Sequence, residues 1–172
     1  MIRLAKSADA DAIAAVHVRG WQAAYRGYFP DDFLDGLSVA DRAERWVAWL
    51  ADAAEGTAVY ETPAGIVGIA SIGPSRDSGA SSATGELLLI YVEPALWRRG
   101  VGTALMSWAT AAAPARDWTA MTLWTIEGNA GARAFYERCG WVHDGATKRE
   151  PFAGHVLSQV RYAWRSAGAQ SS

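Results

Sequence analysis

The chain has 172 residues, of which 51% are hydrophobic and 20% charged, and its formal net charge at pH 7 is −2. This balance is typical of a globular protein, and it excludes nucleic acid as the main partner because no overall positive field would attract phosphates. The single cysteine excludes an internal disulfide and indicates a reducing, cytoplasmic location. The sequence has no signal-peptide pattern and no apolar run near the ~20 residues of a membrane span, so we expect no membrane partner.

The length suits one domain with a sizeable core. We predict that this domain spans residues 1–165 and that residues 166–172, which are small and polar, form a flexible tail. The three histidines lack the spacing of metal ligands, so no metal site is predicted, and His17 is interpreted as a core histidine rather than a cleft residue. Cys139 has no histidine close in sequence and is interpreted as a packing residue.

Hydrophobic periodicity organises the first half of the chain. The predicted elements are a strand at residues 2–5, a helix at 10–24, a short helical turn at 31–37, a helix that Ser38 caps and Gly56 ends, and a hairpin with strands at 57–61 and 66–72. In the helix after Ser38, four side chains are expected to face inward: Ala43, Trp46, Val47 and Leu50. The segment that follows the hairpin, residues 73–84, is small, polar and rich in glycine, and it is predicted to form a mobile loop.

The second half of the chain alternates strands and helices. Residues 87–92 form an apolar run without polar alternation, which predicts a strand buried on both faces and ended by Pro94. The remaining predicted elements are a helix from residue 101, a strand at 118–126, a helix at 129–138 closed by Gly140, and strands at 141–149 and 155–164. The order β, α, α, β, β, β, α, β, α, β, β implies a mixed α/β fold with helices on both faces of its sheet.

A basic glycine loop joins the apolar strand to the next helix and reads Arg98-Arg99-Gly100-Val101-Gly102-Thr103. Its glycines let a ligand approach the backbone closely, and the first turn of a helix offers unpaired N–H groups at the positive end of the helix dipole. With two arginines added, the loop suits a pyrophosphate. The Walker pattern and the third glycine of the dinucleotide fingerprint are both absent. A tight strand-to-helix turn without a ligand is the alternative interpretation.

A second segment of interest is the predicted helix at 129–138. Asn129, Arg133 and Tyr136 lie at i, i+4 and i+7 and therefore share one face of this helix. Asn129 also suits the N-cap, because its side chain can accept from amides two or three residues further on. Taken alone, Asn129 is interpreted as a helix cap and Tyr136 as a half-buried packing residue.

Together the two segments resemble the acetyl-CoA-binding motifs of the GNAT N-acetyltransferase superfamily. The family's loop motif, (Gln/Arg)-x-x-Gly-x-(Gly/Ala), corresponds to residues 97–102, with Trp97 departing from its first position, and its Asn-x-x-Ala-x-x-x-Tyr motif corresponds to residues 129–136. The resemblance extends from Ile2 to about Trp164 and implies a GNAT-type, mostly antiparallel seven-stranded sheet with a splayed central strand pair. It also implies acetyl-CoA as co-substrate, bound through Ile90, Tyr91, Val92, Arg98, Arg99, Gly100, Val101, Gly102, Thr103, Asn129 and Tyr136.

Acyl transfer from a thioester to an amine needs a base for the amine, a donor for the oxyanion and a proton for the thiolate. The resemblance puts the Tyr136 hydroxyl beside the CoA sulfur, so Tyr136 is the predicted general acid. A backbone N–H near Tyr91 or Val92 is the predicted oxyanion donor. Glu86 begins the central strand, where some family members carry a general-base glutamate, and it is the candidate base, directly or through water. A solvated, non-catalytic Glu86, with Glu127 or a water chain as the base, is the alternative.

The sequence therefore predicts an N-acetyltransferase that moves the acetyl group of acetyl-CoA directly to a primary amine of a small molecule or peptide. Four aromatic residues cluster where the first helix becomes a loop, and they form either an acceptor pocket or ordinary packing: Trp21, Tyr25, Tyr28 and Phe29. A non-catalytic acyl-CoA-binding module that acts through a protein partner is the alternative function. The sequence does not fix the acceptor, the acyl chain length or the oligomeric state, for which a homodimer is one option.

Overall fold

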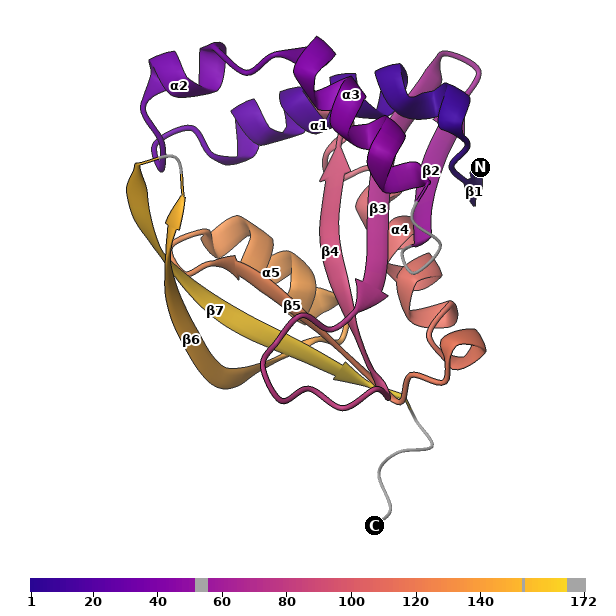
Figure 1. Ribbon diagram of the computed structural model, residues 1–172, viewed down its shortest axis with the longest axis vertical. Coiled ribbons are helices and arrows are strands. Elements are labelled where there is room, and N and C mark those ends of the chain that lie inside the picture. Colours follow the sequence, from indigo (N-terminus) through magenta and orange to yellow (C-terminus); the bar gives the residue numbers. More distant parts are fainter. Residues whose placement is uncertain (52–55, 153, 167–172) are drawn as a thin grey trace. The chain divides into compact units, whose positions relative to one another are not determined.

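The computed structural model describes residues 1–51, 56–152 and 154–166. Seven strands form one sheet (Figure 1), in the order β1 (Ile2–Leu4), β2 (Gly56–Thr62), β3 (Gly65–Pro74), β4 (Thr84–Val92), β5 (Ala120–Ile126), β7 (His155–Arg165) and β6 (Val142–Phe152). The pairs β1–β2, β2–β3, β5–β7 and β6–β7 are antiparallel, and the pair β4–β5 is parallel. The predicted mixed, mostly antiparallel sheet is therefore confirmed. Within the described residues, no helix combines the length and apolar character needed to cross a membrane.

The chain divides into two compact units. Unit 1 comprises Met1–Gly73 and Leu89–Ala109, and unit 2 comprises Pro74–Leu88 and the chain from Thr110 onward. Strand β4 (Thr84–Val92) begins in unit 2 and ends in unit 1. The single domain over residues 1–165 stays a prediction, and the predicted tail lies outside the described residues except for Ser166.

Unit 1 contains the elements of the first half of the chain together with η2 and most of α4. They are β1 (Ile2–Leu4), the 3-10 helix η1 (Ser7–Asp9), α1 (Ala10–Ala24), α2 (Asp31–Asp35), α3 (Val39–Leu50), β2 (Gly56–Thr62), β3 (Gly65–Pro74), η2 (Pro94–Leu96) and α4 (Val101–Ala111), of which Pro74 and the last two residues of α4 belong to unit 2. The bounds of α1 match the predicted helix, and the Ser38 side chain caps α3 by accepting from the Asp41 amide.

The core of unit 1 joins α1 and α3 to strands β2 and β3. Its members recur at three- and four-residue steps on the helices, as an amphipathic pattern requires. They are Ala10, Ile13, Ala14, Ala43, Trp46, Val59 and Ile69. On the opposite face of β3, Gly68 lies under α4, where an added Cβ would meet Val101 at 2.8 Å and Leu105 at 3.0 Å. Helices thus cover both faces of this sheet.

Two expectations for α3 are wrong. Val47 was expected to face inward, but it is 55% exposed, because it follows the buried Trp46 by one residue and therefore points about 100° away from it around the helix. Gly56 was expected to end the helix, but α3 ends at Leu50 and Gly56 begins β2. Residues 52–55 lie outside the described residues.

Unit 2 contains the remaining elements. Its sheet consists of Thr84–Leu88 of β4 together with β5 (Ala120–Ile126), β7 (His155–Arg165) and β6 (Val142–Phe152), and its helices are α5 (Ala130–Arg138) and the 3-10 helix η3 (Pro114–Arg116). Register pairs join Thr84, Gly85 and Glu86 to Ala120, Met121 and Thr122. This parallel pair is the one expected to splay in a GNAT fold.

The two faces of the unit 2 sheet differ. Tyr162 of β7 is fully buried, and its hydroxyl donates to Glu137 and accepts from Arg133, both on α5, so this face lies against the helix. Side chains alternate along a strand, so Trp124 and its register partner Arg161 belong to the opposite face. That face also carries Glu86 and Thr122, which are register partners in β4 and β5.

Burial along β4 is lower than expected. Gly85, Glu86 and Leu87 are buried, but the residues from Leu88 to Val92 are only half-buried. The expected strand buried on both faces is therefore wrong for its last five residues, because an apolar run marks a strand without deciding how much of it is covered. Strand β6 continues through Pro151 to Phe152, beyond its expected end, which an edge strand tolerates because its outward N–H groups need no partner.

Gly85 and Gly131 provide a matched test of packing in unit 2. An added Cβ at Gly85 would overlap the ring of the buried Trp118, whereas at Gly131, exposed on α5, the nearest atom is Asn129 Oδ1 at 3.7 Å. Gly85→Ala is expected to lower the free energy of unfolding by about 3 kcal/mol in urea denaturation. Gly131→Ala should leave it unchanged or raise it by up to about 1 kcal/mol. Similar values for the two variants would contradict this packing.

Candidate active site

The loop between β4 and α4 has an unusual backbone conformation. Arg98 has a φ of 60° and Gly100 a φ of 84°, while Arg99 between them has no positive φ. When successive residues alternate between right- and left-handed backbone conformations, their N–H groups point toward a common centre and form an anion-binding concavity. The Trp97 indole N–H donates to the Val92 carbonyl at 2.9 Å, which ties the loop to the end of β4. Helix α4 begins directly after this loop, at Val101.

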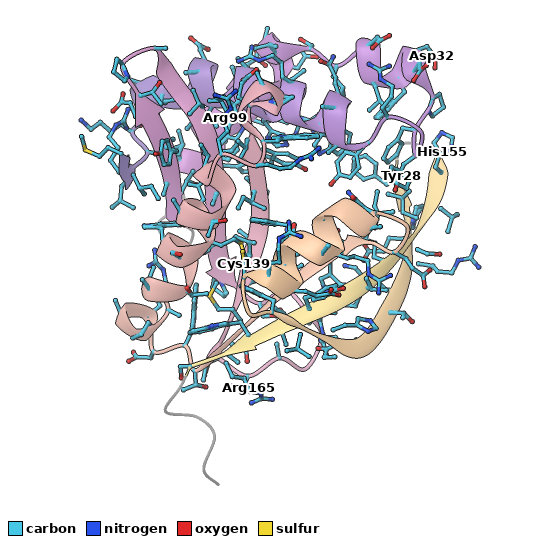
Figure 2. All side chains as sticks on the ribbon, turned by 180° about the vertical axis from the view of Figure 1, so that it is seen from behind. Tyr28, Asp32, Arg99, Cys139, His155 and Arg165 are labelled. Atoms are coloured by element: carbon cyan, nitrogen blue, oxygen red, sulfur yellow. The ribbon has the colours of Figure 1, made fainter. Side chains whose placement is uncertain are left out.

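Positive charge gathers on the same loop. Arg98 and Arg99 are exposed, and within the described part of the chain neither guanidinium has an ion-pair partner. Arg99 is labelled in Figure 2. The Val101 side chain is only 6% exposed and packs inward, so this residue offers a ligand only its backbone. The strained backbone of the loop, the N-terminus of α4 and the two guanidinium groups together make this loop suited to a diphosphate.

The last residues of β4, Ile90 to Val92, are half-buried in unit 1. Tyr91 is held by helix α1. Its ring stacks on His17 with centroids 4.6 Å apart, and its hydroxyl lies 3.4 Å from that of Tyr25. Gly20 makes this approach possible, because an added Cβ would lie 3.0 Å from Tyr91 Cβ. The helix therefore fixes the side chain at the point where an oxyanion donor was predicted.

His17 is a core residue, as expected. It is 4% exposed, and its Nδ1 accepts the Trp46 indole N–H at 3.1 Å. Burial, with a smaller contribution from the charge of Arg42, lowers the pKa of His17 to about 3. The imidazole is thus neutral near pH 7 and has no direct role as an acid there.

The four aromatic residues predicted at the acceptor site lie together in unit 1. The Trp21 ring is 5.0 Å from Tyr25 and 5.7 Å from Phe29, and Phe29 is 5.4 Å from Phe33, a ring that the prediction did not include. Phe29 is 5% exposed, whereas Tyr28 is 37% exposed. Burial raises the pKa of Tyr25, against a smaller lowering by its hydrogen bond to Tyr91. Ordinary packing therefore accounts for Phe29, and Tyr28 keeps an accessible ring.

Helix α5 in unit 2 carries the second motif. Asn129 occupies the N-cap, and its Oδ1 accepts from the Ala132 amide at 3.1 Å, as its position predicted. Tyr136 is half-buried beside Phe135 and Tyr162. Arg133 bonds to the Tyr162 hydroxyl and the Glu127 carbonyl, so it fastens the helix to the sheet. Glu127 itself is exposed.

Glu86, also in unit 2, is a buried carboxylate with an arginine partner. It is 3% exposed, so the alternative of a solvated strand-start residue does not fit. Its Oε1 accepts from Arg76 Nη2 at 2.8 Å, and its Oε2 accepts from the Arg76 backbone amide at 2.8 Å and more weakly from Nε at 3.4 Å. A buried carboxylate requires such a partner to remain charged.

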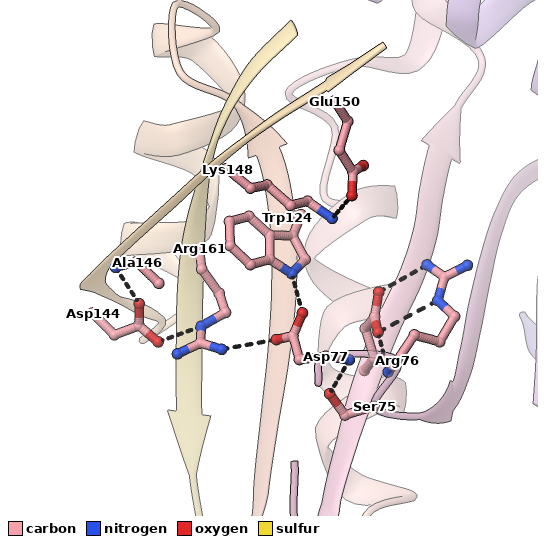
Figure 3. Close-up of polar contacts among 10 residues, drawn as sticks. Ser75, Arg76, Asp77, Trp124, Asp144, Ala146, Lys148, Glu150 and Arg161 are labelled. Carbon is pink, nitrogen blue, oxygen red and sulfur yellow. Dashed lines mark hydrogen bonds and ion pairs between the residues drawn. The ribbon is translucent and has the colours of Figure 1, made fainter. Parts of the chain in front are cut away.

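Asp77, the residue after Arg76, makes a second set of contacts that hold the segment of residues 73–84 (Figure 3). Its carboxylate accepts the Trp124 indole N–H at 2.8 Å and pairs with Arg161 at 2.8 Å, and Arg161 also binds Asp144 at 2.7 Å. The ammonium of Lys148 lies 4.4 Å from the centroid of the Trp124 ring. The segment expected to be a mobile loop is therefore held by charge at two adjacent residues.

Sequence reasoning missed Arg76, Asp77 and Trp124. The available signal was an oppositely charged Arg-Asp pair inside a run of small residues, preceding a glutamate in a predicted strand. Cys139 is half-buried at the C-cap of α5. No group of three or more metal-ligating side chains occurs within the described ranges.

Comparison with known proteins identifies the family. The model of the Acetyltransferase (GNAT) family matches residues 13–141. The chain belongs to the GNAT acetyltransferase family. Uncharacterized N-acetyltransferase YuaI of Bacillus subtilis is 33% identical over 169 residues, which cover 98% of this GNAT chain and 94% of YuaI.

Solved structures share the fold of this GNAT protein. Ribosomal-protein-alanine N-acetyltransferase from Brucella melitensis has a TM-score of 0.74 and 22% identity, covering 96% of this chain and 99% of that one. The structure of yncA from Salmonella typhimurium, with its cofactor acetyl-CoA, has a TM-score of 0.74 and 20% identity, covering 99% of this chain and 96% of that one. The GNAT fold inferred from the sequence is confirmed.

The buried imidazole of this GNAT protein makes its stability depend on pH. The pKa of His17 is about 3 in the folded state against an ordinary 6.5, so the unfolded chain binds more protons between these values and stability falls as pH falls below 6.5. Between pH 7 and pH 5 this should remove about 2 kcal/mol from the free energy of unfolding. His17→Gln, whose amide oxygen can still accept from Trp46, should lose about 2 kcal/mol less than the wild type over this range in urea titrations. An equal loss in both proteins would contradict the assignment.

Proposed function

We propose that this protein transfers the acetyl group of acetyl-CoA directly to a primary amine of a small molecule or peptide. The observation that carries the proposal is the loop before α4, where two left-handed residues and two unpaired arginines favour a diphosphate ligand in a chain of the GNAT family. YuaI is named an N-acetyltransferase, and the yncA structure contains acetyl-CoA as that protein's cofactor. Both names support acetyl-CoA as the donor here.

The proposed cofactor contacts follow the chemistry of each segment. The amides of Gly100, Val101, Gly102 and Thr103 hold the pyrophosphate, and the side chains of Arg98 and Arg99 neutralise it. The backbone of β4 from Ile90 to Val92 lies along the pantetheine arm and supplies the oxyanion donor. Asn129 and Tyr136 of α5 contact the pantetheine and the sulfur. The Asn129 amide nitrogen stays available for such a contact, since its oxygen is used by the cap.

The proposed chemistry divides proton transfer between two residues. Glu86, through water, takes a proton from the ammonium group of the acceptor, and Tyr136 gives its proton to the departing thiolate. Arg76 occupies both carboxylate oxygens of Glu86 without exhausting their capacity, because a carboxylate offers about four acceptor positions. Glu127, exposed at the start of the α5 motif, is the alternative base.

The proposed acceptor contacts come from the aromatic residues of unit 1. Tyr28, which is 37% exposed, is the most accessible of the four predicted residues, with Trp21 and Tyr25 half-buried beside the buried Phe29. The classes of acceptor that remain open are polyamines, aminoglycosides, amino acids, peptide N-termini and lysine side chains. A cytoplasmic location and a homodimer remain expectations from the sequence.

Thiol release from acetyl-CoA with a panel of primary amines tests the proposed function. The wild type should release free CoA only when an accepted amine is present. Tyr136→Phe and Glu86→Gln should each lower kcat by about 100-fold, the usual contribution of an acid or base, while the affinity for CoA measured by calorimetry changes less than threefold.

Two results would contradict this account. Binding of acetyl-CoA without turnover of any amine would favour the non-catalytic acyl-CoA-binding module. Full activity of Glu86→Gln together with loss in Glu127→Gln would move the base to Glu127.

A further inference from the structure

One buried hydroxyl on the same sheet face as Glu86 has no hydrogen bond. Thr122 of β5 is 8% exposed, and its Oγ1 has no partner within the described part of the chain. A buried hydroxyl without a partner lowers stability, because its hydrogen bonds to water are lost on folding and not replaced. Valine has the same shape and β-branching and would avoid this cost. The presence of threonine at this position therefore requires an explanation other than packing.

The register of the sheet puts the Thr122 side chain beside that of Glu86. The two residues are partners in the parallel pair of β4 and β5, so their side chains project from the same face of strands that lie about 4.8 Å apart. A single water that makes hydrogen bonds of about 2.8 Å to each of two groups can connect polar side chains of such neighbours.

The carboxylate keeps the capacity to bind such a water. Arg76 supplies two donors to Oε2 and one to Oε1, which leaves a second acceptor position on Oε1. Both Glu86 and Thr122 are more than nine-tenths buried, and a water between two such polar groups satisfies both of them.

We propose that Thr122 Oγ1 and the Glu86 carboxylate together hold one water, which is the inner end of the water chain that deprotonates the acceptor. This inference rests on the proposed function, because it assumes that Glu86 is the base. Thr122 is a positioning residue here, since it acts on the reaction through the water that it holds.

The proton balance of the step is complete. The acceptor ammonium gives one proton through the chain to the inner water, which passes a proton to Glu86 and leaves it as a neutral carboxylic acid. The free amine then attacks the thioester, the C–N bond forms and the C–S bond breaks. Tyr136 protonates the thiolate, and the second proton lost by nitrogen replaces the one that Tyr136 gave. Glu86 returns its proton to solvent, so one proton is released in each cycle.

Thr122→Val tests the proposal with acetyl-CoA and the panel amine that gives the highest kcat/KM. This isosteric change should lower kcat about tenfold and leave KM for acetyl-CoA unchanged, and Thr122→Ser should recover most of the loss. In a Glu86→Gln background, Thr122→Val should lower kcat less than twofold further, because both changes remove the same relay. Thr119→Val, an exposed residue just before β5, is the matched control and should leave kcat at the wild-type value.

Two results would overturn the inference. A kcat of Thr122→Val within twofold of the wild type, with a raised melting temperature, would mean that the hydroxyl is only a cost to stability. A high-resolution crystal structure of the wild type in which Thr122 Oγ1 bonds to protein alone, without a water shared with Glu86, would do the same. Failure of the proposed function is separate, because it would appear as binding of acetyl-CoA without turnover of any amine. Failure of Glu86 as the base would appear as unchanged activity in Glu86→Gln.

Discussion

The conformation of the turn between β4 and α4 is the constraint on which the functional account depends. Arg98 carries a side chain at φ 60°, a region that costs a residue other than glycine about 1–2 kcal/mol. The indole of Trp97 holds the turn to the Val92 carbonyl and so helps to maintain this conformation. The result is a set of amides at a helix N-terminus with two arginine charges beside them. Such an arrangement costs stability in the free protein, and the anion that we propose would offset this cost on binding.

Buried charge organises unit 2 in a comparable way. The Glu86 carboxylate lies inside the sheet and is compensated by Arg76, and the next residue, Asp77, joins Trp124 and Arg161. Glu86 is buried while the Arg76 side chain is 66% exposed, so removing Arg76 would leave a buried carboxylate without its partner. These contacts hold the loop before β4 against the sheet. The residue that we propose as the base is therefore one of those that hold this loop against the sheet.

Local patterns allowed much of the fold to be predicted. Helix α1 has the predicted bounds because its apolar spacing is regular and an aromatic loop follows it, and Asn129 caps α5 as its side chain suggested. Long-range contacts were not accessible in this way. Nothing in the sequence indicates that Arg76 reaches Glu86, ten residues away, or that Asp77 reaches Arg161, because the path of the loop decides both. The exposure of Val47 and the half burial of Leu88 to Val92 depend equally on which neighbours cover them.

The central claim, that the turn before α4 binds the diphosphate of CoA, is tested most directly by calorimetric titration of CoA into the wild type, Gly100→Ala and Gly145→Ala. Gly100 and Gly145 have φ values of 84° and 88° with no atom within 4 Å of an added Cβ, so both changes impose the same backbone strain. The account predicts that only Gly100→Ala loses CoA affinity, by about tenfold or more, or about 1.4 kcal/mol. Absence of binding heat in the wild type, or equal affinities for CoA in all three proteins, would contradict it.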